Sequence, residues 1–288
     1  MERTSARPRF AYFGTPLFAT IILDELEKSG YVPAVIISAP DKPKGRKLLI
    51  TPSEVKVWGE SRNIPVLTPE KLRNKEFAEV LRSYQCDLFI VAAYGKIIPK
   101  EILEMPTYGV LNVHPSLLPK FRGPSPIESA ILSKVDHTGV TIMKLDEELD
   151  HGDIVAQEEY HAEAWPPKGS ALTIALAHQG GILLAKIIPL WMKEQHSKAQ
   201  DHTQATFTKK ITKEDGLIDL SHDASLNYKK IRAFDEWPGA YFFTERNGKK
   251  IRVRIIDATL SDGVLKILRV VPEGKKEMSY EDFLRGGQ

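Results

Sequence analysis

The stretch Asp87-Leu-Phe-Ile-Val-Ala-Ala93 is an unbroken apolar run with the length of a strand, which is typical of a strand buried on both faces. Residues 10–13 and 32–37 form two more such runs, and between them apolar side chains recur at three- and four-residue steps, as in a helix. Strands that alternate with helices in this way predict an α/β fold with a mainly parallel sheet and helices on both faces. Ligands of such sheets bind at the carboxyl ends of the strands.

The C-terminal third of the chain has a different pattern. Asn247-Gly248 separates two strand-like runs, and this dipeptide is a strong signal for a two-residue hairpin turn. Residues 264–271 alternate as a further strand, whereas the segment before this region is polar and rich in His, Gln and Thr, like a linker. We therefore expect three parts: a first domain over residues 1–195, a linker over residues 196–206, and a small, mainly β domain over residues 207–288.

Bulk composition limits the class of protein. The chain has 288 residues, 42% of them hydrophobic and 27% charged, which is ordinary for a globular protein. Its formal net charge of +2 neither requires nor excludes a nucleic-acid partner. Cys86 is the only cysteine, which rules out an intrachain disulfide and a zinc site with two cysteines from this chain. The apolar run 182–191 is too short to span a bilayer, and residues 1–9 are too polar for a signal peptide, so we expect a soluble, cytoplasmic protein without a membrane partner.

Asn112 and His114 stand two residues apart at the end of an apolar run that Pro115 closes. On a strand they would project from the same face. The Asn amide can donate to a developing oxyanion, and His can exchange a proton near neutral pH. With an Asp that reaches the imidazole, the pair suits attack by an amine on a carbonyl. Spacing alone equally allows a satisfied polar pair at a strand end, and it leaves three candidates for the carboxylate: Asp146, Asp150 and Asp153.

Asn112-Val-His114, then Ser116-Leu-Leu-Pro119, then Leu149-Asp150-x-Gly152-Asp153 resemble the motifs of the folate-dependent formyltransferases. Further stretches over nearly the whole chain resemble the branch of that family that acts on methionyl-tRNA: Phe13-Gly14-Thr15-Pro16, Pro40-Asp41-Lys42-Pro43, Gly123-Pro-Ser-Pro126-Ile127, Thr138-Gly-Val-Thr-Ile-Met143 and Ile231-Arg232-Ala233-Phe234-x-x-Trp237-Pro238. The first of these lacks the glycine spacing of nucleotide loops, so we exclude nicotinamide and ATP binding. Trp237-Pro238 is interpreted as core and turn.

The resemblance implies a Rossmann-like formyltransferase domain followed by a small C-terminal β-barrel of the oligonucleotide-binding type that contacts tRNA. Residues 257–264 look like a very short connection, so we expect this barrel to be reduced. The implied reaction transfers a formyl group from 10-formyltetrahydrofolate to the amino group of initiator methionyl-tRNA. It implies no metal and no covalent enzyme intermediate, and we expect a monomer.

The resemblance also implies roles for individual residues. Asn112 and His114 would polarise the formyl carbonyl and stabilise the oxyanion, and Asp150 would pair with His114 and assist removal of the amine proton. Two stretches would bind the folate, the second through its backbone: Ser116, Leu117, Leu118 and Pro119, and Ala92, Tyr94 and Gly95.

Two basic segments would contact tRNA, one in a loop and one on a C-terminal strand: Lys42, Lys44, Arg46 and Lys47, and Lys250, Arg252 and Arg254. Phosphate contacts supply most of the affinity of proteins for nucleic acids, which makes both assignments physically reasonable. A solvated loop and an edge strand protected by charge would show the same residues. The continuation Lys47-Leu48-Leu49 is less basic than in the resembling family.

Three other functions compete with this interpretation. A formyltransferase that acts on a nucleotide-linked amino sugar would use the same Asn-His-Asp set, but the basic segments disfavour it. A non-catalytic RNA-binding protein would not need Asn112, His114 and Asp150 together. A glycinamide ribonucleotide formyltransferase would have no need of a C-terminal β domain.

Overall fold

A seven-stranded sheet forms the centre of the first of two units into which the chain divides. The structure is a computed structural model that describes residues 7–44, 48–246 and 248–286. The strand order is β5-β2-β1-β6-β7-β8-β9; the first five strands are parallel, β8 is antiparallel to β7, and β9 to β8. The predicted mainly parallel sheet is confirmed. The strands are β1 (Phe10–Gly14), β2 (Val35–Ile37), β5 (Val66–Leu67), β6 (Leu88–Ala92), β7 (Val110–His114), β8 (Thr138–Lys144) and β9 (Ile154–Tyr160).

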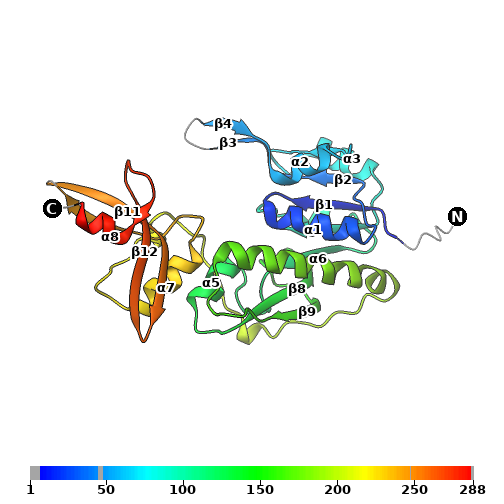
Figure 1. Ribbon diagram of the computed structural model, residues 1–288. Coiled ribbons are helices and arrows are strands. Elements are labelled where there is room, and N and C mark those ends of the chain that lie inside the picture. The colour runs from blue at the N-terminus through cyan, green and yellow to red at the C-terminus, as the bar shows by residue number, and fades with distance from the viewer. Residues whose placement is uncertain (1–6, 45–47, 247, 287–288) are drawn as a thin grey trace. The chain divides into compact units, whose positions relative to one another are not determined.

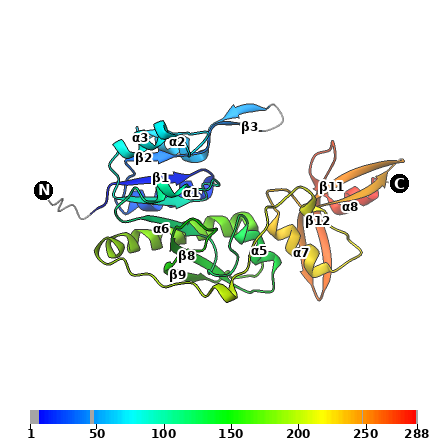
Figure 2. The same cartoon turned by 180° about the vertical axis from the view of Figure 1, so that it is seen from behind.

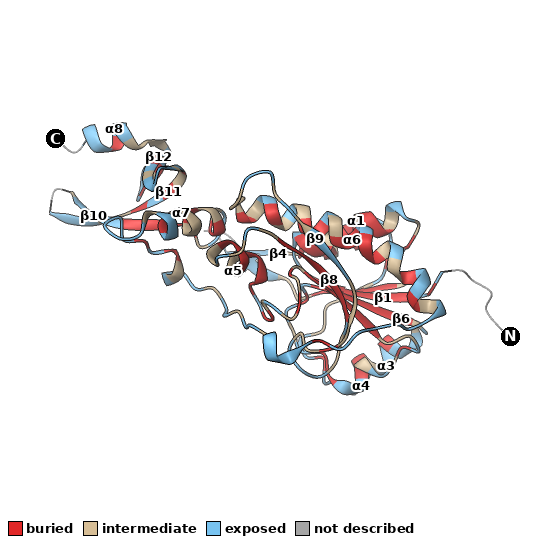
Figure 3. Cartoon of the chain, turned by 90° about the horizontal axis from the view of Figure 1, so that it is seen from below, coloured by how far each residue is buried: buried red, intermediate tan, exposed pale blue. Residues whose placement is uncertain are grey.

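Helices cover both faces of this sheet, and its central strands are buried throughout (Figures 1 and 3). On one face α3 and α4 pack Phe77, Leu81 and Ile102 against Phe13 and Phe89 of the sheet. On the other lie α1, α2 and α6. The alternation of side chains along a strand explains why each central strand supplies both cores. The helices are α1 (Leu17–Lys28), α2 (Glu54–Glu60), α3 (Lys75–Ser83), α4 (Lys100–Leu103) and α6 (Gly169–Lys193).

Helix α6 is longer than the apolar run seen in the sequence. It has 25 residues and is long and apolar enough to cross a membrane by length and composition alone. In the structure it packs on the sheet instead: the backbone at Gly180 lies so near that a Cβ there would come within 2.7 Å of Val113. Two of its own side chains, Leu184 and Trp191, are buried, as in the core helix of a globular protein.

A short antiparallel hairpin stands where a basic loop was expected. Its strands are β3 (Lys42–Lys44) and β4 (Leu49–Thr51), with Lys42 paired to Thr51. The two opposite views show it extending outward from the α2 side of the first unit (Figures 1 and 2). Residues 45–47, between the strands, lie outside the described residues.

The second unit comprises Ser125–His137, His161–Thr173 and Thr208–Gln288. Its four-stranded antiparallel sheet has the order β10-β11-β12-β13. Val253 and Val270 of this sheet share a core with Ile231 of α7 and Phe283 of α8. The elements are α5 (Pro126–Leu132), the 3-10 turn η2 (Glu214–Gly216), α7 (Ala224–Ala233), β10 (Tyr241–Arg246), β11 (Lys249–Ser261), β12 (Val264–Pro272), β13 (Met278–Ser279) and α8 (Tyr280–Arg285).

The expected short connection over residues 257–264 is in fact part of a long hairpin. Residues 257–261 continue β11, and only Asp262 and Gly263 form the turn, with φ of 50° and 75°. The strand carries a register shift after Ile255, which bends it. In the described part of the chain the four strands pair in one row, which is a reduced form of the expected barrel.

The segment expected as a linker, residues 196–206, is a fixed part of the first unit. Lys198 and Ile154 exchange two backbone hydrogen bonds of 2.8 Å, and Gln200 is only 5% exposed. The segment contains the 3-10 turn η1 (His202–Gln204). Its polar composition misled the sequence interpretation, because side-chain amides and backbone groups hold it instead of apolar contacts.

Candidate active site

Asn112 and His114 lie at the carboxyl end of β7, in the middle of the sheet. Asn112 pairs with Val91 of β6 and Met143 of β8, and His114 pairs with Thr141 of β8. Both side chains project from the same side of the strand. They are 8% and 4% exposed, so the groups predicted to be catalytic stand in a buried position at the ligand-binding edge of the sheet.

The hydrogen bonding of His114 defines its tautomer. Nε2 lies 3.0 Å from the carbonyl oxygen of Phe121. A carbonyl oxygen can only accept, so Nε2 carries the hydrogen and donates it. In the neutral ring Nδ1 is therefore the nitrogen that is free to accept a proton.

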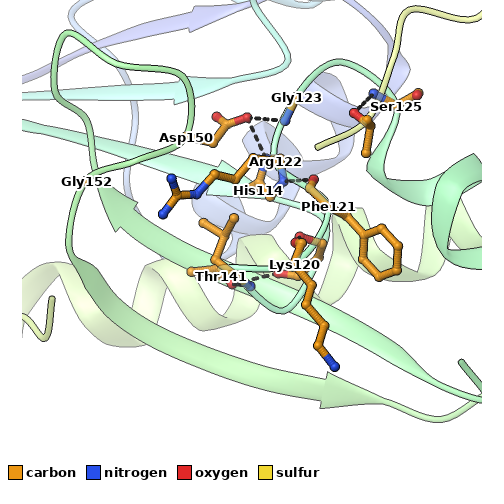
Figure 4. Close-up of polar contacts among 12 residues, drawn as sticks. His114, Lys120, Phe121, Arg122, Gly123, Ser125, Thr141, Asp150 and Gly152 are labelled. Carbon is orange, nitrogen blue, oxygen red and sulfur yellow. Dashed lines mark hydrogen bonds and ion pairs between the residues drawn. The ribbon is translucent and has the colours of Figure 1, made fainter. Parts of the chain in front are cut away.

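Of the three candidate carboxylates, Asp150 is the one that faces His114. Its Oδ2 lies 3.7 Å from Nδ1 and accepts a 2.7 Å hydrogen bond from the backbone N–H of Gly123 (Figure 4). Asp146 and Asp153 bind other side chains. The 3.7 Å separation is that of an ion pair and too long for a hydrogen bond. The structure thus brings Asp150 and His114 together across the loop that follows β8.

The side-chain amide of Asn112 is available to a ligand. Within the described residues it has no hydrogen-bond partner, although the residue is only 8% exposed. The polar atoms of this amide are not among the fully enclosed unpaired atoms of the described residues, so a ligand at the end of the strand can reach them and supply the partner. An amide N–H in this place can donate to an oxygen on which negative charge develops.

The stretch predicted to bind folate, Ser116 to Pro119, is largely turned inward. Ser116 and Leu118 are buried, and the Ser116 hydroxyl donates to the carbonyl of Lys120 at 2.7 Å. The N–H of Leu118 is bonded to Thr141. Leu117 and Pro119 are half-buried. These side chains build the turn that carries Phe121 to His114, and only the half-buried pair offers surface to a ligand.

The second predicted folate stretch presents backbone and not side chains. The Tyr94 ring packs edge-on against Phe13, and burial raises the pKa of its hydroxyl to about 12. Ala93 and Gly95 have φ of 46° and 76°, and a Cβ on Gly95 would meet nothing within 4 Å. Beyond Ala92, where β6 ends, the chain therefore forms an open turn. Ile97, which sequence reasoning missed, is 85% exposed beside it.

The basic residues of the β3–β4 hairpin are only partly described. Lys42 is exposed, whereas the side chain of Lys44 and all of Arg46 and Lys47 lie outside the described residues. Burial, and then the charge of Lys42, lower the pKa of Lys96 on the β6–α4 loop. Positive charge from the hairpin thus reaches the loop next to the candidate site.

The three basic residues of β11 share one face but differ in their surroundings. Lys250 and Arg254 are exposed, whereas the Arg252 guanidinium lies 3.7 Å from the centre of the Tyr241 ring. Trp237 was expected in the core, yet it is 55% exposed. On the opposite face of β11, Val253 and Ile255 are buried in the second unit's core.

Two buried polar residues near Asp150 were missed by the sequence interpretation. Arg122 is 3% exposed, and Gln200 lies between Arg122 and the Asp150 loop. Arg122 directly precedes the recognised motif Gly123-Pro-Ser-Pro126-Ile127, so its position carried a signal. Gln200 carried none, because it lies in a polar segment. No cluster of three or more potential metal ligands occurs among the residues the structure describes.

Comparison with known proteins identifies the family. The formyl transferase family model matches residues 8–188, and the model of its C-terminal domain matches residues 210–262. A methionyl-tRNA formyltransferase of Chloroflexus aggregans is 42% identical over 96% of this chain and 97% of its own length. One from Halalkalibacterium halodurans is 39% identical over 96% of this chain and 94% of its own.

A solved structure agrees in fold. The methionyl-tRNA formyltransferase from Clostridium thermocellum aligns with a TM-score of 0.59 at 17% identity, over 94% of this chain and 99% of that one. At this identity the likeness concerns the fold alone. The two family models and the curated relatives together establish that the chain belongs to the formyl transferase family and, within it, to the methionyl-tRNA formyltransferases.

Proposed function

We propose that the protein transfers the formyl group of 10-formyltetrahydrofolate to the α-amino group of initiator methionyl-tRNA, giving the N-formylmethionyl-tRNA used in translation initiation. The observation that carries the proposal is the meeting of Asn112, His114 and Asp150 at the end of β7, in a chain of this family. We place the reaction in the cytoplasm, with a monomer acting without a metal or a membrane.

The surroundings of these residues suit a reduced folate. A pterin needs flat apolar walls and a few polar groups that orient it. The open turn at Ala93 and Gly95 offers backbone groups, and the exposed side chains of Ile97 and Leu149 offer apolar surface. The donor supplies a formyl carbon bonded to a nitrogen of the reduced folate.

Asn112 stabilises the charge that develops as the amine attacks. The amine nitrogen bonds to the formyl carbon, and the formyl oxygen becomes negative. The unpaired Asn112 amide donates to that oxygen at no cost to an existing hydrogen bond. One oxyanion donor of this kind is worth about 10²–10³ in kcat.

His114 and Asp150 move the proton that the attacking amine must lose. Nδ1 of His114 is free to accept it, because Nε2 is committed to Phe121. Asp150, at 3.7 Å, stabilises the positive ring that results. The bond between the formyl carbon and the folate nitrogen then breaks, and the proton passes to that nitrogen.

Methionyl-tRNA is favoured over an amino sugar because exposed basic groups occur in both units. Lys42 is exposed on the hairpin, Arg254 is exposed on β11, and the Lys250 ammonium of β11 lies 4.6 Å from the centre of the exposed Phe243 ring. Basic groups interleaved with aromatic rings suit RNA, whose phosphates pair with the former and whose bases stack on the latter.

The test offers the purified protein 10-formyltetrahydrofolate and three acceptors separately: methionine-charged initiator tRNA, free methionine and a nucleotide-linked amino sugar. Mass spectrometry after nuclease digestion detects the formylated product, and His114→Ala serves as the inactive control. We expect formylation of the charged tRNA alone, abolished in the control. Formylation of the amino sugar and not of the tRNA, or of no acceptor at all, would overturn the proposal.

A further inference from the structure

Arg122 is a buried cation that pairs with no carboxylate in the described part of the chain. Its Nη2 donates to Oε1 of Gln200 at 2.7 Å and to Nδ1 of His202 at 2.8 Å, and its Nε donates to the same Gln200 oxygen at 3.1 Å. The guanidinium also lies 5.9 Å from the centre of the Phe207 ring. Burial of a charge without a counter-ion is costly, so this geometry must be held by something other than ion pairing.

Gln200 uses both ends of its amide at once. Its oxygen accepts the two bonds from Arg122, and its Nε2 donates to the carbonyls of Asp150, at 2.9 Å, and Gly152, at 2.7 Å. The amide orientation follows from these partners, since a guanidinium can only donate and a carbonyl can only accept. Gln200 therefore connects Arg122 to the backbone on either side of His151.

Asp150 needs such support because its backbone is in the left-handed region, with φ of 47°. A non-glycine residue there is strained and keeps that conformation only when its surroundings impose it. The carboxylate is held by the N–H of Gly123, and the carbonyl is held through Gln200 by Arg122. Both ends of Asp150 are thus fixed to two adjacent residues of one loop, the loop whose Phe121 carbonyl fixes His114.

His202, the other hydrogen-bond partner of Arg122, contacts the Asp150 loop through a side chain. Its Nδ1 accepts from Arg122, so that nitrogen carries no proton. The ring stacks on His151, with centroids 4.1 Å apart and planes 5° from parallel. His151 is in turn bonded to Asp146 at 2.8 Å. Gln200 therefore holds the backbone of this loop through hydrogen bonds, and His202 contacts it through the stacked ring of His151.

From these contacts we infer that Arg122 and Gln200 are positioning residues that hold Asp150 opposite Nδ1 of His114. The inference rests on the proposed function, in which Asp150 stabilises the protonated ring. It gives a role in catalysis to the polar segment around Gln200, which lies between the residues matched by the two family models. Neither residue touches the reacting atoms; their effect is on the distance and orientation of the carboxylate.

The test replaces one atom of Gln200. Gln200→Glu keeps an oxygen for Arg122 and gives that buried cation a counter-ion, but it places a carboxylate oxygen against the carbonyls of Asp150 and Gly152. A purely structural role predicts a lower melting temperature but an unchanged kcat for the folded variant. Positioning predicts a kcat that falls at least about tenfold, since misplacement of a group by about 1 Å can cost about 10²-fold, while both KM values stay unchanged.

Two further variants complete the experiment. Gln179→Glu on α6 is the matched control, because Gln179 also donates to a backbone carbonyl, that of Glu159. It should leave kcat unaltered. Gln200→Met removes both the donor and the acceptor, and we expect it to lower kcat and the melting temperature together.

A second readout is independent of the acceptor. The NMR titration curve of the His114 ring reports directly on its carboxylate, and we expect Gln200→Glu to shift it toward the curve of Asp150→Asn. If wild type formylates methionyl-tRNA but Gln200→Glu is fully active with an unshifted curve, the inference fails and the proposed function stands. If wild type does not formylate tRNA, the proposed function fails, and the shift of the His114 curve alone decides the positioning of Asp150.

Discussion

Asn112 and His114 project from the same face of β7, yet only one of the two side chains is hydrogen-bonded within the described residues. His114 is anchored through Nε2, whereas the Asn112 amide has no partner among the described residues. Their common face was predictable from the sequence, since side chains two apart on a strand project together. Asp150 was predictable only through the family's motif, because spacing left three carboxylates open. Gln200 was not predictable, since its contacts join segments far apart in a polar stretch.

Replacement of Asn112 by Asp tests the free amide. The variant keeps the shape of the side chain but puts a carboxylate where a donor is required, so we expect kcat to fall by about 10²-fold or more, with binding of the folate little changed. Steady-state kinetics and folate titration measure the two effects. Asn74→Asp, at the N-cap of α3, is the control, because Asp caps a helix as well as Asn. An Asn112→Asp enzyme with wild-type kcat would refute the assignment.

Gly152 is the residue that lets the Asp150 loop approach β8. A Cβ at this position would lie 2.0 Å from the carbonyl oxygen of Lys144, so the backbone would have to move. We expect Gly152→Ala to cost about 1–3 kcal/mol of stability and to lower kcat, as the loop shifts Asp150 away from His114. Urea unfolding and kinetics measure both. Gly286→Ala, where the nearest contact is an ordinary 3.4 Å, should change neither; an unaltered Gly152→Ala would contradict the packing described.

At the scale of elements, the sequence was most informative where apolar periodicity was strong. The central strands β1 and β6 were recognised because they are apolar on both faces, and β7 because an apolar run there is closed by Pro115. The long β11–β12 hairpin was missed, since Asp257, Thr259 and Ser261 interrupt the apolar pattern on an exposed part of the strand. Solvent-facing positions of an antiparallel strand tolerate polar residues, and their pattern then resembles a loop.

Helices α1 and α6 are joined by Glu25, which bonds to Lys28 at 2.7 Å and to His178 at 2.8 Å. The bond from Lys28 lowers the pKa of Glu25 more than burial raises it, and the bond from His178 lowers it further. A folded-state pKa below the unfolded value means that this stabilisation is present above the unfolded pKa and disappears as the pH falls through the folded one.

We therefore expect Glu25→Gln to lower the free energy of unfolding by roughly 1 kcal/mol at about pH 7, a modest value because Lys28 and His178 are exposed. The difference from wild type should shrink as the pH is lowered below about 4.5. Urea unfolding at several pH values measures it, with exposed Glu79→Gln as the control. A difference that stays constant down to acid pH would show that charge on Glu25 is not the cause.

At the scale of the whole chain, the formal net charge is only +2, so attraction for RNA must come from local groups. The sequence predicted two domains joined by a linker, whereas the structure divides into two units without a separate linker, each composed of several segments of the chain. Helix α5 and residues 161–173 belong with the C-terminal strands, as the hydrogen bonds from Lys229 to Ser133 and from Ser170 to Asp235 illustrate. Such contacts between distant segments leave no periodic signal in the sequence.

Removal of two exposed charges from β11 tests the RNA-binding role of the second unit. We expect Lys250→Ala with Arg254→Ala to weaken binding of methionyl-tRNA and to reduce the slope of log affinity against log salt by about 2, because each of the two side chains would neutralise one phosphate. Fluorescence titration over a range of salt concentrations measures this slope. Lys75→Ala with Lys186→Ala, two exposed lysines of the first unit, should leave it unchanged. An unaltered slope in the β11 variant would exclude that face from RNA binding.

The most direct measurement of the central claim is a single-turnover transfer of isotope-labelled formyl from 10-formyltetrahydrofolate to methionyl-tRNA, by wild type and by His114→Ala, with both substrates saturating. We predict that label passes to the methionine amino group without appearing on the protein. In His114→Ala the transfer should be at least about 10²-fold slower, while the folate remains bound. Equal rates in the two proteins, or label trapped covalently on the enzyme, would contradict direct amine attack assisted by His114.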